Sequence, residues 1–414
     1  MGSTPPVLHA SCIGIAIVPC GSDAGHILFV RTRIINKVWA LHASSTPTAS
    51  PMQKIIIGTF ATLNILTVIL LLATGYAGHL SPPAHPYLSL AGYAFPLFLC
   101  LNLAFIVLWM YIRWTYIILP FAGFILACQP VTTYCPLNLP QQPPQGCIKV
   151  LSYNILGFNP SVVPDGTPNP ILEYIACSDA DIVCLQEYAA IAGEDSLKAV
   201  IDSLYPHRDT LLSRGYRMPA GDVVAIYSRY PIKRKAHIPI TTKGNTLGAF
   251  VLDIDGEEVH VINAHLETVG LTMEEKSHFS AMVHGQTQRR AMRRESENLV
   301  RKLSESTVMR APQADAIAEY IAQHQGERII MCGDLNDHPL SYVRHTLAQR
   351  LTDCYTASGC LPGFSFSYHS MFVRIDNIMC SEHYKPYAAK IDKTIHLSDH
   401  YPIYTFLLPE NESK

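Results

Sequence analysis

One long stretch of this chain is almost free of charge. Between residues 55 and 148 the only formally charged side chain is Arg113. The chain has 414 residues, of which 49% are hydrophobic and 15% are charged, whereas soluble globular proteins carry about 25% charged residues. Such a stretch excludes intrinsic disorder, which requires polar and charged sequence, and it excludes an ordinary soluble protein. We therefore expect membrane-spanning helices.

Three apolar runs fill this stretch, at residues 55–77, 88–112 and 114–131. A helix that crosses a bilayer needs roughly 20 predominantly apolar residues. The first two runs, of 23 and 25 residues, meet this requirement, and the third, of 18 residues, is marginal. We predict three transmembrane helices within residues 52–131, and we keep open whether the third run crosses fully.

The charges in the loops predict the orientation of these helices. Lys54 precedes the first run, Arg113 lies between the second and the third, and residues 76–87 carry no Lys or Arg. Because cytoplasmic loops are enriched in Lys and Arg, we expect the N-terminus and the Arg113 turn in the cytoplasm. Three spans then place the rest of the chain outside the cytoplasm, whereas two spans would leave it inside.

The segments on either side of the helices carry their own signals. Met52 and Lys54 form a short basic end that is followed at once by an apolar helix, as at a natural start. Residues 1–51 are therefore expected to be a non-native or disordered extension. Residues 132–147 are rich in Pro and Gln, a composition that is typical of stiff, extended linkers. We expect this linker to hold the following domain away from the bilayer.

Residues 148–414 are long enough for one large domain with its own core. From residue 149 onward, 26 Lys and Arg face 32 Asp and Glu, so the net charge is −6. An acidic domain argues mildly against tight, sequence-independent nucleic-acid binding, which depends on phosphate neutralisation. Short apolar runs alternate with helical patterns, and this alternation predicts a layered α/β domain. Strands are expected at residues 148–153, 182–186, 223–228, 249–254, 259–264, 329–332, 375–379 and 401–408, and helices at 171–176, 196–204, 272–284, 296–304 and 311–324.

Several of these strands meet an acid, an amide or an imidazole at one end, which no strand core requires. One such residue is usually a turn former or a helix cap. Six strand ends that carry such residues are better explained by a functional site, because α/β domains bind ligands where strand ends converge. The residues are Asn154, Glu187, His265, Asp334 with Asn336, Asp376, and Asp399 with His400.

The chemistry of this set suits oxygen ligands and phosphate esters. Carboxylates and amides, without the Cys and His spacing of a zinc site, favour Mg²⁺, Mn²⁺ or Ca²⁺. A hard cation, a carboxylate that positions water and an imidazole that faces a phosphate are the parts needed for phosphoester hydrolysis.

Taken together, the motifs resemble the endonuclease/exonuclease/phosphatase superfamily, which has the DNase I-like fold. They cover about residues 148–410 in the order found in the family. The motifs are Leu-Ser-Tyr-Asn154, Leu-Gln-Glu187, Asn263-Ala-His265-Leu, Gly-Asp334-Leu-Asn336-Asp337, Arg-Ile-Asp376 and Ser-Asp399-His400-Tyr-Pro. The resemblance implies a four-layer α/β sandwich, in which two packed mixed β-sheets are flanked by helices, preceded here by the transmembrane helices.

The resemblance also implies a metal site and the residue that activates water. Glu187 matches the family's principal metal-binding carboxylate, Asn154 lies beside it, and Asp399 matches a second metal-linked acid. Asp334 matches the aspartate that orients or deprotonates the attacking water. Some members carry an acid where this chain has Leu156, so the resemblance leaves one and two metal ions open.

The remaining matched positions are implied to contact the phosphate. Asn336 matches the amide that binds phosphoryl oxygens, and His400 matches the histidine at the scissile phosphate, which Asp376 orients. His265 matches a second histidine, which faces the phosphate and can protonate the leaving group. Asn263, in the same motif as His265, is assigned to substrate binding.

The anchor and an insert are similar to those of bacterial membrane-bound members of the superfamily. This similarity implies a domain on the periplasmic side of the inner membrane. The insert, residues 268–310, carries a cluster of basic residues. Arg290 and Arg294 would be neighbours on a helix. They form either an ordinary solvated face or a clamp that binds phosphates or anionic lipid headgroups near the edge of the active site.

The cysteines suggest two further expectations. Cys354 and Cys360 bracket a short loop and are the best candidates for a disulfide, which is permitted outside the cytoplasm. Cys184 and Cys332 lie within strand patterns and are expected in the core.

The sequence thus predicts a membrane-anchored, metal-dependent phosphoester hydrolase of the phosphodiesterase or endonuclease type. A phosphomonoesterase and a lipid phosphodiesterase stay open as alternatives on the same site. A non-catalytic, membrane-anchored binding protein is the alternative of another class. The expected partners are a phosphate ester, whether nucleic acid, lipid headgroup or small molecule, and the lipid bilayer. No obligate protein partner is inferred.

Overall fold

The computed structural model describes residues 50–159, 163, 167–188, 195–213, 223–284, 289–368 and 371–410. The predicted extension, residues 1–51, therefore lies almost wholly outside the described residues. The chain forms two compact units, Met1–Thr62 and Leu63–Lys414. The first contributes the beginning of helix α2, and the second contains everything discussed below.

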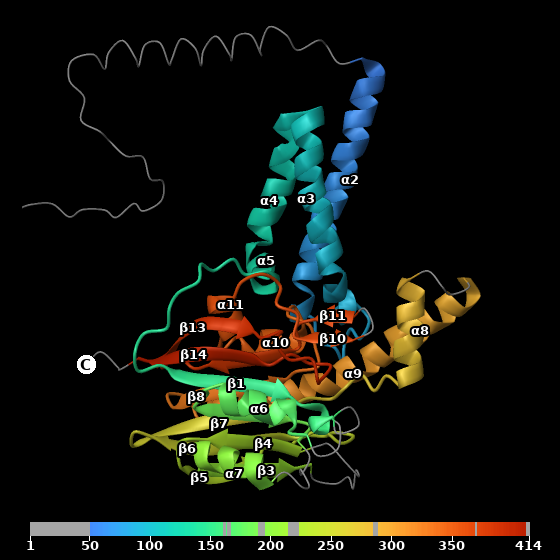
Figure 1. The fold of residues 1–414 in the computed structure, drawn as a ribbon. Helices are drawn as coiled ribbons and strands as arrows, with labels where there is room; N and C mark the ends of the chain where they lie inside the picture. The colour runs from blue at the N-terminus through green and yellow to red at the C-terminus, as the bar shows by residue number, and fades with distance from the viewer. Residues whose placement is uncertain are drawn as a thin grey trace, which may run out of the picture. The chain divides into compact units, whose positions relative to one another are not determined.

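The apolar stretch forms helices of the expected kind (Figure 1). Helix α2 spans Pro51–Gly75, and a 3-10 turn, η2 (Leu88–Ala94), leads into α3 (Phe95–Ile112). Among the described residues, these two 25-residue stretches are each long and apolar enough to cross a membrane. A third, broken pair follows the 3-10 turn η3 (Trp114–Ile117), so the count is two or three.

The third pair consists of α4 (Ile118–Leu126) and α5 (Cys128–Tyr134), which are bent by 70° relative to each other. Pro130 lies in the first turn of α5 and has no N–H to donate to the carbonyl of Leu126 four residues earlier. The hydroxyl of Tyr76 donates to that carbonyl instead, at 2.8 Å. The carbonyl of Leu126 therefore keeps a hydrogen bond in spite of the bend.

Polar side chains pair between α2 and α3 within the apolar region. The Nδ2 group of Asn64 donates to Asn102 at 3.2 Å, and the indole N–H of Trp109 donates to Oδ1 of Asn64 at 2.9 Å. All three side chains are fully buried. In helices that cross a bilayer, where no water reaches such groups, pairing of this kind holds neighbouring helices together.

The connection between the two long helices packs against the large domain. It contains η1 (Ala77–His79), where a Cβ on Gly78 would lie 2.7 Å from the carbonyl oxygen of Leu340. A Cβ on Gly92 would lie 2.1 Å from the imidazole of His338. Only glycine permits this close approach of the two backbones.

The segment that was expected to act as a spacer also contacts the domain. Leu137 forms a β-bridge with Cys360, and the amide of Asn138 donates to the carbonyls of Thr356 and Gly359. The first part of the segment is thus held against the domain. The domain boundaries themselves remain predictions.

The large domain contains two six-stranded mixed sheets. The first has the order β13–β14–β1–β2–β4–β3 and the second the order β5–β6–β7–β8–β12–β9. One neighbouring pair in each sheet is parallel, β1 with β2 and β7 with β8. The strands of the first sheet are β13 (Tyr384–Ile391), β14 (Ile403–Pro409), β1 (Ile148–Asn154), β2 (Ile182–Gln186), β4 (Val223–Ser228) and β3 (His207–Leu212). Those of the second are β5 (Ile232–His237), β6 (Leu247–Ile254), β7 (Glu257–His265), β8 (Arg328–Asp334), β12 (Asp376–Cys380) and β9 (Thr352–Asp353).

The two sheets pack face to face, and helices cover their outer faces. Val150 and Ile182 of one sheet and Phe250 and Ile330 of the other share one buried cluster. Helices α6 (Pro170–Cys177) and α7 (Asp195–Leu204) cover the first sheet, and α9 (Arg289–Gln323) and α10 (Tyr342–Leu347) cover the second. The predicted four-layer α/β sandwich is confirmed (Figure 1).

All eight predicted strands are present, with ends displaced by at most two residues. The structure adds β3, β5, β13 and the short β9, and a separate hairpin of β10 (Phe366–Tyr368) and β11 (Met371–Val373). Strands β3, β5 and β13 lie at sheet edges, where charged residues protect an exposed edge and hide the apolar alternation of a strand.

The predicted helices at 296–304 and 311–324 form one helix, α9, which continues through Pro312. A Pro inside a helix normally breaks it. Here Ala311, Ala314 and Ile317 are buried against the second sheet, and this packing keeps the helix continuous. The predicted helix at 272–284 is α8 (Met273–Val283).

The expected disulfide between Cys354 and Cys360 is wrong for this structure, in which both are free. Helix α11 (Cys354–Ser358) directs Cys354 into the core, where its sulfur lies 3.7 Å from that of Cys380. Cys360 is exposed. The expectation that Cys184 and Cys332 lie in the core is confirmed.

Candidate active site

The site forms where strands of both sheets end. Asp334 is the last residue of β8, and strand register places His265 of β7 on one side of it and Asp376 of β12 on the other. Asn154 ends β1 in the facing sheet, and its Nδ2 lies 3.2 Å from Oδ2 of Asp334. The structure therefore brings together residues that are up to 222 positions apart in the chain.

Asp334 is the central residue of this edge and is 1% exposed. Its Oδ1 accepts from the backbone N–H of Asn336 at 2.8 Å, and its Oδ2 lies 3.2 Å from the side-chain amide of the same residue. Burial, the largest influence, raises the pKa of the Asp334 carboxyl, and the neighbouring His400 opposes this shift. A carboxylate with a raised pKa is a stronger base towards a bound water.

His400 is held by a second carboxylate. Its Nδ1 donates to Oδ2 of Asp376 at 2.9 Å, while its Nε2 lies 3.6 Å from Oδ2 of Asp334. The backbone N–H of Asp376 donates in turn to the hydroxyl of Ser365 at 3.0 Å. Burial alone would lower the pKa of His400, but Asp376 and Asp334 outweigh it and raise the pKa to about 10. The ring is therefore an imidazolium at neutral pH.

Glu187 and Asn154 lie on the other side of Asp334. The amide of Asn154 donates to Oε1 of Glu187 at 3.0 Å, and Nε2 of His265 lies 3.7 Å from the same oxygen. Nε2 of His265 also lies 3.8 Å from Oδ2 of Asp334. Glu187 has a φ of +51°, a conformation that costs a non-glycine residue about 1 kcal/mol or more and is typical of functional sites.

Asp399 completes the group of acids. Its Oδ1 lies 3.9 Å from Nε2 of His400, and its side chain is 11% exposed. The predicted catalytic and metal-binding residues are thus all found at one edge of the sandwich. Their individual roles remain proposals.

The donor set fits a hard divalent cation. Glu187 offers a carboxylate that is 28% exposed. The Asn154 amide faces it through Nδ2, while the Oδ1 of Asn154 accepts from the backbone N–H of Leu156, and the Asp399 carboxylate lies beside His400. Ligand atoms of Asp334, Asp376 and His400 also lie within 4.8 Å of one another, but the Nδ1 of His400 is bonded to Asp376. Mg²⁺, Mn²⁺ and Ca²⁺ prefer oxygen ligands of this kind.

Asn263 does not join this group. It is fully buried, its amide donates to the carbonyls of Leu185 and Ala225, and its Oδ1 accepts from Gln186 at 2.7 Å. These contacts favour a structural place between the two sheets, and substrate binding by Asn263 stays a prediction.

The basic residues Arg290 and Arg294 of the insert belong to the N-terminal part of α9. The side chain of Arg290 is outside the described residues, and Arg294 is exposed on the N-terminal part of α9. Figure 1 shows this part of α9 extending beyond the sheets together with α8. Its neighbour Arg293 pairs with Glu297 at 2.8 Å, as expected for a solvated helix face. Substrate binding by Arg290 and Arg294 remains a prediction.

A buried ion pair between Arg310 and Asp337 next to the site was not predicted from the sequence. The Nε of Arg310 lies 3.2 Å from Oδ2 of Asp337, and both side chains are almost fully buried. Arg310 also donates to the carbonyl of Glu267, two residues after His265. Asp337 belongs to the motif Gly-Asp334-Leu-Asn336-Asp337, but no sequence pattern links it to an arginine 27 positions away.

The comparisons with known proteins agree with this arrangement of strands and motifs. The family model described as "Endonuclease/Exonuclease/phosphatase family" matches residues 151–400, and a model described as a domain of unknown function (DUF8431) matches residues 54–134. A search of curated proteins finds no match to the chain.

Solved structures are similar to the large domain. Sphingomyelinase C from Streptomyces griseocarneus is 18% identical, with a TM-score of 0.43, and the match covers 64% of this chain and 99% of that one. An endonuclease/exonuclease/phosphatase from Beutenbergia cavernae is 17% identical, with a TM-score of 0.45, over 64% and 72% of the two chains. The catalytic domain of human Nocturnin is 17% identical, with a TM-score of 0.44, over 64% and 96%. Because the family model matches more than half of the chain, this protein belongs to the endonuclease/exonuclease/phosphatase family.

Proposed function

We propose that this protein is a membrane-anchored, divalent-metal-dependent phosphodiesterase of the endonuclease type. The observation that carries the proposal is the surrounding of Asp334. This one buried carboxylate lies within 4 Å of two imidazoles and two side-chain amides. A binding protein has no need to bury an acid among such groups, whereas a hydrolase needs them around the attacking water.

Each residue then has a definite task. Asp334 accepts the proton of the attacking water, and the imidazolium of His400 binds the phosphoryl oxygens. Asn336, whose amide donates here to Leu266 and Asp334, would exchange one of these bonds for a phosphoryl oxygen. Asp376 keeps His400 charged and correctly oriented through its hydrogen bond to Nδ1. His265, on the opposite side of Asp334, donates a proton to the leaving group. Glu187, Asn154 and Asp399 would hold the divalent cation, which supplies charge neutralisation at the phosphate when bound.

We further propose three membrane crossings. The connection between α2 and α3 packs on the large domain, as does the segment that follows α5. The connection and the domain must then share one side of the membrane. With two crossings the domain would lie on the side of Arg113, opposite the connection, whereas a third crossing by α4 and α5 returns the chain to it. The distribution of Lys and Arg makes that side the periplasm.

A lipid phosphodiester is the second candidate substrate. The loop that starts at Asn336 leads directly to His338 and Leu340, which contact the connection between α2 and α3. If those helices cross a bilayer, the site lies close to its surface. A bilayer lipid would therefore reach the site without leaving the membrane plane.

A substrate panel distinguishes these possibilities. The full chain in detergent or nanodiscs is given plasmid DNA, RNA, sphingomyelin vesicles and a phosphomonoester, each with Mg²⁺, Mn²⁺ or Ca²⁺. Cleavage of DNA or RNA supports the endonuclease type, and headgroup release from vesicles alone supports the lipid phosphodiesterase. Hydrolysis of the monoester alone would favour a phosphatase. Binding of these substrates without turnover of any would overturn the enzyme proposal.

A further inference from the structure

A second cluster of metal-ligating side chains lies on the outer face of the second sheet. It consists of His260 on β7, His324 directly after α9 and Glu327 directly before β8. One ligand atom from each lies within 4.8 Å of the other two. Side chains alternate along a strand, so His260 faces α9, whereas His265 of the same strand faces the active site. The two sites are therefore distinct.

One tyrosine orients both imidazoles of this cluster. The Nδ1 of His324 donates to the backbone carbonyl of Tyr320 at 2.8 Å, and the Nδ1 of His260 lies 2.8 Å from the hydroxyl of the same residue. The donation leaves the lone pair of the His324 ring on Nε2, and the Tyr320 hydroxyl can do the same for His260. Histidines that bind metals are typically held in this way, by a partner at the nitrogen that does not bind.

The second nitrogen of His260 points to a missing ligand. His260 is 1% exposed, and within the described part of the chain its Nε2 has no hydrogen-bond partner of good geometry. Oε2 of Glu327 lies 2.6 Å from this nitrogen, without the geometry of a hydrogen bond. A buried polar nitrogen without a partner is costly.

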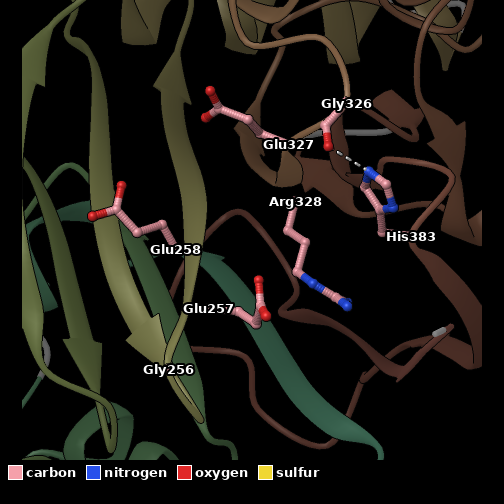
Figure 2. A pocket seen from close by; sticks show the side chains of 7 residues that line it. All are labelled: Gly256, Glu257, Glu258, Gly326, Glu327, Arg328 and His383. Atoms are coloured by element: carbon pink, nitrogen blue, oxygen red, sulfur yellow. Dashed lines mark hydrogen bonds between the residues drawn. The ribbon is translucent and has the colours of Figure 1, made fainter. Parts of the chain in front are cut away.

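Charged side chains near Glu327 form bonds to other groups, which leaves its carboxylate able to bind an ion. Its neighbour Glu258 is occupied by Arg234, which forms two hydrogen bonds to it at 2.7 and 3.0 Å. Figure 2 shows the carboxylate of Glu327 pointing away from His383, whose Nε2 bonds to the carbonyl of Gly326 at 3.0 Å. The side chain of Glu327 is 48% exposed and borders a cavity of about 610 Å³, so an ion can reach it from solvent.

We propose that His260, His324 and Glu327 form a binding site for a transition-metal ion, with Zn²⁺ as the best match. Two imidazole nitrogens and one carboxylate oxygen are a donor set that suits zinc, with the fourth position left to water. The ion would join the C-terminal end of α9 to the middle of β7. Its role would be to fix the insert helix on the sheet, away from the chemistry at Asp334.

Zinc content of the purified full chain tests this site. Wild type, His324→Gln and Glu327→Gln are dialysed in detergent against Zn²⁺ with excess Mg²⁺, which occupies the oxygen-rich active site, and bound zinc is measured by mass spectrometry. The matched control is His284→Gln, which removes an exposed histidine outside the cluster. Wild type and control should hold one more zinc ion per chain than either cluster variant. Equal zinc content in all four proteins would overturn the proposal.

Two further readouts separate a metal site from a histidine–glutamate ion pair. Co²⁺ should give visible absorption bands in wild type that His324→Gln lacks, and Zn²⁺ should raise the melting temperature of wild type but not of His324→Gln. Tyr320→Phe, which keeps the ring but removes the hydroxyl, should weaken zinc binding by about 10-fold to 100-fold. If added Zn²⁺ stabilises the folded His324→Gln and Glu327→Gln variants as much as wild type, the residues form only an ion pair.

Discussion

Asp334 is the residue on which the proposed chemistry depends, and its neighbours explain why it is suited to it. Burial raises its pKa, while the imidazolium of His400 keeps it in the charged form that can accept a proton. Asp376 in turn keeps His400 charged. The surroundings thus raise the pKa of both Asp334 and His400 above the ordinary values of these groups.

Asp376→Asn is expected to lower activity, most strongly at alkaline pH. The pKa of His400, raised to about 10 largely by Asp376, would fall when that charge is removed. The active form needs a protonated His400, so the alkaline limb of the pH–rate profile should move to lower pH, while the acid limb, set by Asp334, should move little. Profiles of wild type and variant over the same pH range check this. An unmoved alkaline limb would exclude the proposed pairing.

Substitutions at Asn336 distinguish the role of its side-chain amide from that of its backbone conformation. It has a φ of +51°, and its amide contacts both Asp334 and the carbonyl of Leu266. Asn336→Gly and Asn336→Ala both remove the amide, and we expect a similar loss of turnover in both. Alanine alone adds a strained left-handed conformation, so its variant should be less stable than the glycine variant by about 1 kcal/mol. Thermal unfolding and turnover, measured side by side, test both parts; an active alanine variant would contradict the proposed phosphate contact.

At the scale of elements, the polar contacts between the sheets fix where the strand ends meet. Asn263 of β7 donates to carbonyls of β2 and β4 and accepts from Gln186 at the end of β2. Glu187 follows Gln186 directly, so this network ties the metal-binding candidate of the first sheet to the strand that carries His265. Buried hydrogen bonds of this kind favour one arrangement of the layers.

Asn263→Leu should therefore reduce stability and leave substrate affinity unchanged in the folded protein. The substitution removes the hydrogen bonds of Asn263 to two buried carbonyls and to the Gln186 amide, which keeps its bond to Ser152. Each buried group left without a partner costs about 1–3 kcal/mol. We expect a marked fall in melting temperature with an unaltered KM. A raised KM in a variant of wild-type stability would instead support substrate binding by Asn263.

The elements that the sequence predicted best are those with buried, uninterrupted apolar runs. Strands such as β2 and β4 have no polar interruption, and their bounds agree with the expectation. Edge strand β5 is mostly Lys, Arg and His, so its strand character depends on pairing with β6, which a local pattern does not contain. The site residues could be predicted because motif and strand end coincide. The Arg310–Asp337 pair could not, because it forms only after α9 has packed on the sheet.

At the scale of the whole molecule, the second compact unit joins apolar helices and catalytic domain without a gap. Leu71, Phe95 and Ala127 of the helices share a buried cluster with Leu340 of the domain. Arg374 is buried two residues before Asp376, and it donates to the carbonyl of Thr133 in α5. The helices are therefore more than a tether, since they contact segments that carry catalytic candidates. The Pro- and Gln-rich composition predicted a linker here. Contacts between segments far apart in the chain leave no local pattern in the sequence, so they could not be predicted.

Gly92→Leu tests whether this junction matters for the site. The new side chain would collide with the imidazole of His338, two residues after Asn336, and should displace that loop. A displacement of about 1 Å at a reacting group can cost about 100-fold in rate, so we expect a large fall in turnover. The matched control is Gly58→Leu in α2, where the space around the glycine is open. Equal turnover of both variants would mean that the junction does not position the loop.

The most direct measurement is hydrolysis of bis-(p-nitrophenyl) phosphate by the purified full chain, with and without Mg²⁺, Mn²⁺ or Ca²⁺. Wild type is compared with Asp334→Asn and with Asp315→Asn, which alters an exposed aspartate of α9. We predict metal-dependent turnover that Asp315→Asn retains and that Asp334→Asn reduces by roughly 10²–10⁴-fold. Equal rates for wild type and Asp334→Asn, or full turnover after chelation of the metal, would contradict metal-dependent hydrolysis centred on Asp334.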